Sequence, residues 1–512
     1  MSRFSVAVIM LVTIGIVSAG EAEAVTWSFV SANQKVFPDT EIGDRHSVIL
    51  HAARGEYVSI QIALRSEQDE LLDLAVDMPA EIFECKYIDT PGVAAWGFPD
   101  EERYSDLRRE VYPDPLLPVT EIALESGVTR SLWLRVQAEE PQTITVEFGE
   151  ERAEIELEVW PFALPETPTL RTAIGLGGAG FARIYDTEIG SERYHQLYSR
   201  YYEALLQYRL SGYRPPWGVM DERGQQYLID PRVTSFILPY SGDPDRMREI
   251  WRQLTALGIA DWGWFYNIDE PTTLEEYETV KGQVNYLRRV APGADYGLPF
   301  YTGLPDGSTP FDHLADFVSM WMIQTDYYHH GHGLGDRVRR QATERFDAGD
   351  EIWLYTAHAP RVPFCNILLN NTALQHRLLF WQVYAEHIAT GYIYWSSTYW
   401  DQTDDPWTDI ATVKNIDGHV WGDGSLFYPG LAEKGHLPED GPIGSIRLEA
   451  IRAGLQDHDL LMLAEQVWGR ERAQQLARRM VPSLVDYVTD HEEFAAFRVE
   501  LGRRLAAEPR AD

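Results

Sequence analysis

Two adjacent carboxylates, Asp269 and Glu270, follow an apolar run and are themselves followed by a proline. The run, residues 262–268, is rich in the aromatic and β-branched residues typical of a buried strand. Pro271 cannot donate a ladder hydrogen bond, so we expect the strand to end there, with Glu270 held extended by its proline neighbour. Neighbouring acids push their pKa values apart, so one can be a protonated donor while the other stays ionised. That division of roles suits sugar chemistry.

Both acids can serve one pocket only under a geometric condition. Successive side chains on a regular strand point to opposite faces, so the strand must break or bulge at its end. Pro271 favours such a break. In the alternative interpretation, Asp269 caps the next helix or pairs with an arginine, and Glu270 is a surface acid.

Two further segments follow predicted strands and could bind a sugar. Aromatic faces pack against the C–H side of sugar rings, while polar groups fix the hydroxyls. We expect at least one of these rings to be exposed, with Trp395 the first candidate for the core. The candidate substrate-binding residues are Asp326, Tyr327, Tyr328, Trp395, Tyr399, Trp400 and Asp401.

The sequence favours no metal and no cofactor. His329, His330 and His332 lie close together, but a helical HExxH spacing and a nearby cysteine pair are missing, so a solvated loop is the better interpretation. Residues 175–180 fit GxGxxG, but no acid stands at the required position in a following strand. We interpret that segment as a loop at the mouth of the predicted barrel.

The charge and the N-terminus indicate where the protein works. There are 79 acidic and 44 basic residues, a net charge of −35, which disfavours nucleic acid and anionic membranes as partners. Arg3, the apolar residues 6–17 and the small residues after them predict a signal peptide over residues 1–24. The apolar stretch is short for a membrane anchor. We expect a secreted or periplasmic protein. A disulfide between the two cysteines, Cys85 and Cys365, is possible but does not follow from the sequence.

The repeating patterns divide the mature chain into three parts. Residues 25–165 alternate in short segments typical of a β-sandwich, although residues 112–118 look too proline-rich for a strand and are expected to cross the surface. Residues 166–440 alternate strands with helices and fit a (β/α)₈ TIM-like barrel, with an open doubly wound sheet as the alternative. Residues 441–512 are helical and expected to pack on the barrel. The candidate barrel strands are residues 170–176, 235–238, 262–268, 296–300, 317–322, 351–355 and 391–395.

This order of parts resembles the domain of unknown function 4091 family, which is related to the β-N-acetylgalactosaminidases of glycoside hydrolase family 123. The markers are residues 112–118, the Asp-Glu-Pro of 269–271, and residues 445–452 with Gly454 and Asp457. In the last marker we expect charge pairs where the tail helix meets the barrel, made by Arg447, Glu449, Arg452 and Asp457. Where family members often show an acid and a tyrosine late in this marker, this chain has Leu-Gln-Asp-His at 455–458.

The resemblance implies a substrate-assisted mechanism and roles for both acids. Asp269 would orient the 2-acetamido group of the sugar and stabilise the oxazolinium that forms. Glu270 would protonate the leaving oxygen and then activate water. The expected activity is a retaining exo-glycosidase on β-linked N-acetylhexosaminides of an oligosaccharide or glycoconjugate.

Two alternatives remain open at this stage. In the first, Asp401 or Asp404 is a separate nucleophile about 5 Å from Glu270, and the substrate is another sugar. In the second, the protein binds glycans without catalysis, because a barrel does not guarantee activity. The sugar, its linkage and the oligomeric state do not follow from the sequence.

Overall fold

The computed structural model describes residues 25–77, 79–90, 109–331, 333–415 and 418–508. The predicted signal peptide therefore lies outside the described residues. Within them, none of the helices combines the length and the apolar character that a membrane span needs. Cys85 and Cys365 are both buried and free.

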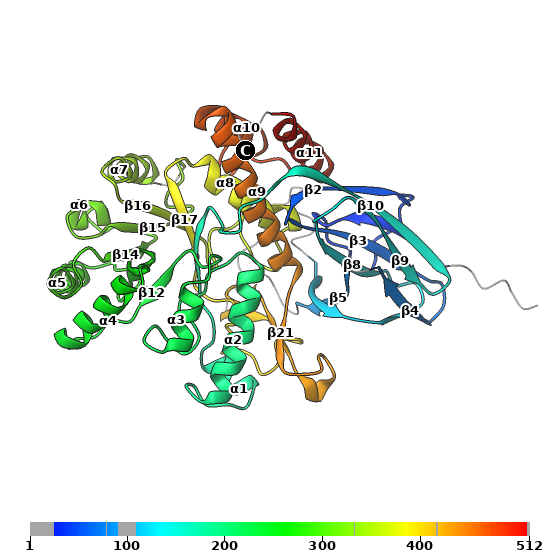
Figure 1. Cartoon of the computed structure of the whole chain (residues 1–512), viewed down its shortest axis with the longest axis horizontal. Coiled ribbons are helices and arrows are strands. Elements are labelled where there is room, and N and C mark those ends of the chain that lie inside the picture. Colours follow the sequence, from blue (N-terminus) through cyan, green and yellow to red (C-terminus); the bar gives the residue numbers. More distant parts are fainter. Residues whose placement is uncertain (1–24, 78, 91–108, 332, 416–417, 509–512) are drawn as a thin grey trace, which may run out of the picture.

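The N-terminal part consists of two five-stranded sheets, at the right of Figure 1. Their pairings are antiparallel apart from the parallel pair β2 and β10. One cluster of apolar side chains with members in both sheets, such as Ile62, Leu134 and Ile155, fills the space between them. The sheet orders are β1-β3-β8-β5-β6 and β2-β10-β9-β4-β7. The strands are β1 (Thr26–Ser31), β2 (Val48–Arg54), β3 (Tyr57–Arg65), β4 (Glu70–Val76), β5 (Glu81–Asp89), β6 (Val111–Pro118), β7 (Glu121–Leu124), β8 (Arg130–Gln137), β9 (Gln142–Phe148) and β10 (Glu151–Ala163).

Strand β6 corrects one expectation. The proline-rich residues 112–118 form a strand, paired antiparallel with β5, and not a surface crossing. The strand lies at the edge of its sheet, where the missing N–H groups of prolines are tolerated. It is buried because the start of the C-terminal part covers it: the Leu116 amide donates to the Gly444 carbonyl at 3.0 Å.

The middle of the chain forms a nearly closed parallel barrel, ordered β11-β17-β16-β15-β14-β13-β12. The strands follow one another in chain order and the first pairs with the last, so the sheet curls on itself and is not doubly wound. Between β11 and β12, Ile174 N donates to Ser211 O at 2.8 Å and Ile237 N donates to Tyr213 O at 2.7 Å. The strands are β11 (Arg171–Ile174), β12 (Phe236–Leu238), β13 (Gly263–Phe265), β14 (Asp295–Phe300), β15 (Met320–Gln324), β16 (Glu351–Tyr355) and β17 (Ala389–Tyr394).

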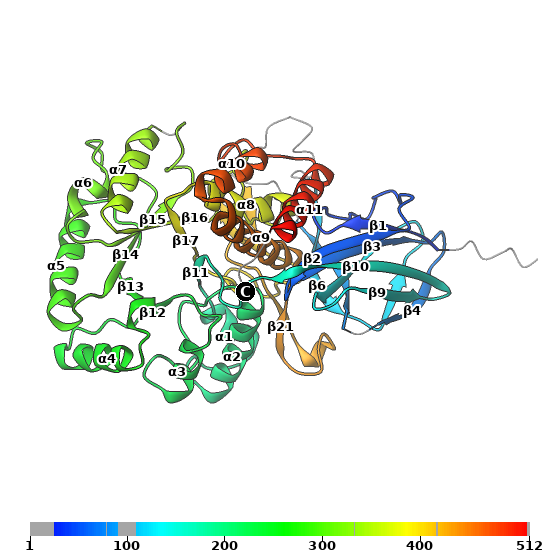
Figure 2. The same ribbon diagram turned by 45° about the horizontal axis from the view of Figure 1, so that its top comes forward.

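Helices surround this barrel (Figure 2). Amphipathic helices such as α5 turn their apolar residues inward, and Thr273 begins α5 with a capping box to Glu276. Helix α8 is buried on nearly all sides, with Gln375, His376 and Gln382 among its buried residues, because the barrel and the C-terminal helices enclose it. The helices are α1 (Ala179–Ile184), α2 (Glu192–Gln207), α3 (Glu222–Leu228), α4 (Pro244–Ala256), α5 (Leu274–Val290), α6 (Pro310–Leu314), α7 (Gly335–Asp347) and α8 (Ala373–Ala385).

After β17 come two short hairpins and then three helices that lie between the barrel and the sandwich sheets (Figure 2). The described residues of the hairpin segment, 396–415 and 418–445, hold both hairpins and lead to Ser445, which caps α9. The strands are β18 (Ala411–Asn415), β19 (Gly418–Trp421), β20 (Tyr428–Gly430) and β21 (Gly441–Ile443); the helices are α9 (Ile446–Trp468), α10 (Arg470–Met480) and α11 (His491–Ala507).

The charges predicted on the tail helix are all paired, with partners from the sandwich as well as the barrel. Arg447 binds Asp114 of β6, and Asp457 binds Arg377 of α8. Glu449 binds Arg135 of β8 and Arg452 of its own helix. Fully buried pairs of this kind contribute little net stability, but removing one partner leaves a costly unpaired charge. They fix how the tail sits against both other parts.

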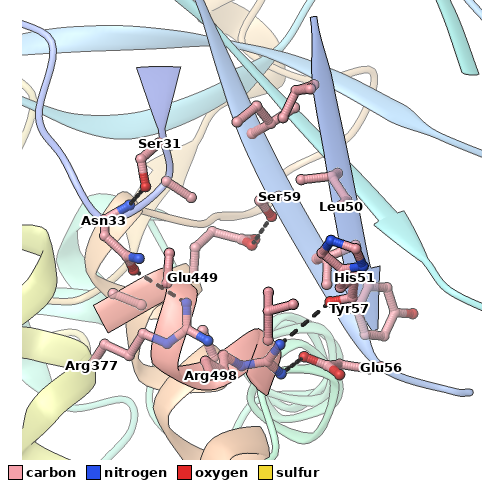
Figure 3. Close-up of a pocket in the computed structure, with 18 of the residues that line it drawn as sticks. Ser31, Asn33, Leu50, His51, Glu56, Tyr57, Ser59, Arg377, Glu449 and Arg498 are labelled. Carbon is pink, nitrogen blue, oxygen red and sulfur yellow. Dashed lines mark hydrogen bonds and ion pairs between the residues drawn. The ribbon is translucent and has the colours of Figure 1, made fainter. Parts of the chain in front are cut away.

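A small cavity of about 160 Å³ lies at this junction, between β2, β3 and the helices α9 and α11 (Figure 3). Its arginines are engaged by carboxylates: Arg498 binds Glu56 and Asp457, and Arg377 binds Asp457. The cavity is therefore part of the interface and offers no cation to a ligand.

Candidate active site

A larger cavity, of about 750 Å³, opens at the carboxyl ends of the barrel strands. This is the face on which barrel enzymes carry their active sites, and the volume is in the usual range for ligand pockets. Polar and aromatic side chains from the segments after β13, β14, β15, β16 and β17 surround it. The lining residues are Tyr213, Tyr266, Asp269, Glu270, Pro299, Tyr301, Thr302, Gln324, Asp326, Tyr355, Ala357, His358, Ala359, Ile393, Trp395, Tyr399, Thr412 and Asp423.

Both predicted acids line this cavity because the strand ends early. β13 stops at Phe265, not at residue 268, so the chain is already irregular at Asp269. Glu270 has a φ of 43°, in the left-handed region that non-glycine residues rarely adopt. The expectation of an extended Glu270 is therefore wrong, and the turn at this residue carries the two side chains to one side. Backbone strain of this kind costs about 1–3 kcal/mol and is concentrated at functional sites.

The alternative role for Asp269 as a helix cap does not hold. The side chain of Thr273 caps α5, and its N3 partner is Glu276. Asp269 is exposed and instead accepts a hydrogen bond from Tyr266 Oη at 2.6 Å.

Glu270 is half-buried and bound by a second tyrosine. Tyr355, the last residue of β16, donates its hydroxyl to Glu270 Oε1. Burial raises the pKa of Glu270, and the charge of Asp269 raises it further, while the Tyr355 hydrogen bond and the charge of His358 act in the opposite direction. Burial and the two acids hold the pKa values of Tyr355 and Tyr266 well above the usual range. Both tyrosines are therefore hydrogen-bond donors at neutral pH, and the raised pKa of Glu270 favours its protonated form.

Trp395 lies across the barrel mouth from the acids. It follows β17, which is separated from β13 by β16, β15 and β14 in the parallel sheet. Its side chain is 37% exposed, so it is not the core residue that we expected, and Tyr399 packs edge-on against it with ring centroids 4.7 Å apart. Its Nε1 donates to Asp423 Oδ1 at 2.9 Å. The indole and the two carboxylates therefore line the same cavity.

Three predicted substrate-binding residues belong to the core instead. Tyr327 and Tyr328 are 1% and 2% exposed, since the turn after β15 directs them inward; Tyr327 packs against Phe300 and Tyr328 lies beneath Arg339. Trp400 is fully buried, with its ring stacked on Phe181. Only their neighbour Asp326 reaches the cavity from that segment.

The two candidates for a separate nucleophile also lie elsewhere. Asp401 is exposed and accepts a hydrogen bond from Gly180 N at 3.0 Å. Asp404 is fully exposed beside Arg183. Neither lines the cavity, so the geometry does not support a nucleophilic role for them.

Several lining residues were missed from the sequence. Tyr355 and Tyr301 stand at or just after the carboxyl ends of predicted strands, so their position carried a usable signal. Asp423 did not, because it lies in the hairpin segment beyond the last barrel strand. Burial raises its pKa, opposed by the hydrogen bonds from Trp395 and Tyr394 and by the charges of His358 and Arg447.

The histidine cluster and the glycine loop differ in what the structure describes of them. Among the described residues no three metal-binding side chains converge, and His332 lies outside them. The glycines of 175–180 serve close packing: a Cβ on Gly175 would lie 1.9 Å from Trp395 O, and one on Gly180 would lie 2.5 Å from Asp401 N.

Comparison with known proteins agrees with this geometry. Residues 247–464 match the glycoside hydrolase 123 catalytic domain. The chain is related to glycoside hydrolase family 123. The matched segment carries the catalytic domain of a glycoside hydrolase, and it contains both acids, Tyr355, Trp395 and Asp423.

The fold is shared with a solved family 123 glycoside hydrolase from Clostridium perfringens, described in a study of glycolipid glycan hydrolysis. The two chains are 14% identical with a TM-score of 0.65, and the likeness covers 94% of this chain and 97% of that one. A β-D-glucuronidase from Dictyoglomus thermophilum is similar over 85% of this chain and 68% of the glucuronidase chain, at 10% identity. Its TM-score of 0.30 is too low to indicate a shared fold. No curated protein matches the sequence.

Proposed function

We propose that the protein is an exported, retaining exo-glycosidase that hydrolyses β-linked N-acetylhexosaminides with assistance from the substrate. The observation that carries the proposal is the pair Asp269 and Glu270, adjacent in the chain and lining one cavity, each bound by its own tyrosine. The exo mode, which acts on a terminal sugar, is part of the proposal and rests on the resemblance to the family. Export rests on the predicted signal peptide.

In the first step the sugar provides its own nucleophile. The carbonyl oxygen of the 2-acetamido group attacks the anomeric carbon, and the bond to the leaving oxygen breaks. Glu270, whose pKa is raised by burial, gives its proton to that oxygen. Asp269, held at Oδ1 by Tyr266, accepts the acetamido N–H through its other oxygen and stabilises the positive charge on the oxazolinium.

In the second step water opens the oxazolinium. Glu270 is now ionised and removes a proton from the water as its oxygen attacks the anomeric carbon, which restores the acetamido group. Two inversions at that carbon retain its configuration. The position of Asp401 and Asp404 outside the cavity supports this route over one that needs either of them as a nucleophile.

The test compares aryl β-glycosides with and without a 2-acetamido group. We expect hydrolysis of the acetamido substrates, inhibition by a thiazoline analogue of the bicyclic intermediate, and loss of activity in Glu270→Gln and Asp269→Asn. Asp404→Asn is the matched control, with the same change outside the cavity. Equal hydrolysis of sugars without the acetamido group would contradict substrate assistance. Binding of glycans without hydrolysis of any substrate would establish the non-catalytic alternative.

A further inference from the structure

Among the described residues, two carboxylates line the cavity in addition to Asp269 and Glu270. They are Asp326 and Asp423. Asp423 is 2% exposed and lies between β19 and β20, outside the strand and helix repeats of the barrel. Trp395 Nε1 and Tyr394 Oη donate to it at 2.9 and 3.0 Å, and both bonds end on Oδ1. From the described residues, Oδ2 accepts none.

The backbone around Asp423 is fixed from both sides. Arg447 donates to the carbonyls of Gly422 and Ser425 at 2.7 and 2.6 Å, and it also binds the Ile367 carbonyl and the buried Asp114. On the cavity side, Gly424 has a φ of 68°, and a Cβ there would lie 2.3 Å from Trp395 Cζ2. The Asp423 side chain is thus preorganised at the cavity wall.

Oδ2 is not among the described buried side-chain atoms that lack a hydrogen-bond partner, so it keeps accessible surface at the cavity wall, where the hydroxyl of a bound sugar can donate to it. The position of the acids decides which hydroxyl it is. The anomeric carbon must lie beside Asp269 and Glu270 on the β13 side, while Asp423 is bound to Trp395 and Tyr394 at the end of β17, across the ring of strands. The far end of a pyranose from C1 carries the 4-hydroxyl and the 6-hydroxyl.

We propose that Asp423 is a specificity-determining residue that accepts a hydrogen bond, through Oδ2, from the 4- or 6-hydroxyl of the terminal sugar. The inference rests on the proposed function for the identity of the sugar and for the placement of its anomeric carbon. Asp423 would then have two roles: Oδ1 orients the indole of Trp395, and Oδ2 accepts a hydrogen bond from the substrate.

The experiment is a thermodynamic double-mutant cycle in which one change is made in the protein, at Asp423, and the other in the sugar, at one hydroxyl. Affinities of the wild type and Asp423→Asn are measured by calorimetry for N-acetylgalactosamine, N-acetylglucosamine and their 3-deoxy, 4-deoxy and 6-deoxy forms. Asparagine can keep the acceptor for Trp395 and Tyr394 while it turns the Oδ2 acceptor into a donor. Asp404→Asn is the matched control.

We expect Asp423→Asn to weaken binding of the better parent sugar by about 10- to 100-fold, the range of a hydrogen bond to a charged group. Removal of the 4- or the 6-hydroxyl should weaken wild-type binding by a similar factor and cost nothing more in the variant, because the two losses are one interaction. The 3-deoxy sugars and Asp404→Asn should show no such coupling.

Additive losses for every hydroxyl, or coupling with the 3-hydroxyl alone, would overturn the inference. Should Asp423→Asn fail to fold, wild-type affinities that are equal for parent, 4-deoxy and 6-deoxy sugars would overturn it by themselves, as would no binding of either parent. Calorimetry needs no turnover, so coupling without hydrolysis refutes only the proposed function. Hydrolysis without coupling refutes only the role of Asp423.

Discussion

Replacing Tyr355 with phenylalanine isolates one hydrogen bond that controls the candidate acid. Tyr355 is the last residue of β16, and its hydroxyl is the donor to Glu270 Oε1. Burial and the charge of Asp269 raise the pKa of Glu270, and the Tyr355 hydrogen bond opposes them. Phenylalanine keeps the ring in place and removes only the donor. The pKa of Glu270 should therefore rise further.

The size of the rise follows from the strength of the lost bond. A hydrogen bond to a charged group contributes about 1.5–3 kcal/mol, and about 1.4 kcal/mol corresponds to one pH unit, so the pKa should rise by about one to two units. Glu270 acts first as an acid and must be protonated. Activity is lost as the pH rises through its pKa, so the basic limb of the profile should move to higher pH by that amount.

The assay is the pH dependence of kcat/KM for an aryl β-N-acetylhexosaminide, which reports the free enzyme. Tyr301→Phe is the matched control, because Tyr301 lines the same cavity, is 42% exposed and has no bond to either acid among the described contacts. Its basic limb should stay in place. An unmoved or lowered limb in Tyr355→Phe, or an equal shift in the control, would refute the assignment of Glu270 as the acid.

Three further predictions test other parts of the structure. Asp269→Asn should lower kcat/KM on acetamido substrates by at least about 100-fold, as for loss of a preorganised group that stabilises developing charge, while Asp404→Asn stays near wild type. The pKa of Glu270 is raised in the folded state, so its ionisation destabilises the fold as the pH rises through that pKa. Glu270→Gln should therefore have a higher melting temperature than the wild type at pH 8. The difference should vanish at about pH 3, where the carboxyl group of the wild type is protonated in both the folded and the unfolded state. Asp114→Asn should destabilise the protein by about 3–5 kcal/mol in urea unfolding, since it leaves Arg447 buried without its carboxylate.

The sequence was informative where local chemistry decides the structure. The aromatic run before Asp269 and the proline after Glu270 marked a strand end, and barrel strands present their carboxyl ends to a common cavity. The two acids were found for that reason. The exact end of β13 and the left-handed turn at Glu270 were not, because they depend on packing that no pattern of residue types encodes.

Other misses have equally specific causes. Tyr327 and Tyr328 follow a strand end as Asp326 does, but the direction of a side chain in a turn depends on a few backbone angles, and these send both rings into the core. Asp423 enters the cavity from a hairpin segment that has no place in the alternation of strands and helices. Strand β6 was hidden by its prolines, which its edge position accommodates.

The two sequence markers without a catalytic role meet each other in the structure and lead back to the cavity. The first provides Asp114 on β6, and the second provides Arg447 on α9; both side chains are fully buried. Arg447 also donates to the backbone carbonyls of Gly422 and Ser425, on either side of Asp423, and Asp423 in turn binds Trp395. Arg447 can be buried behind the cavity wall because the charge of Asp114 compensates its own. The N-terminal sheets are therefore a structural part of the candidate site. Without them, Arg447 would lack its carboxylate partner directly behind Asp423, the residue that binds the indole of Trp395.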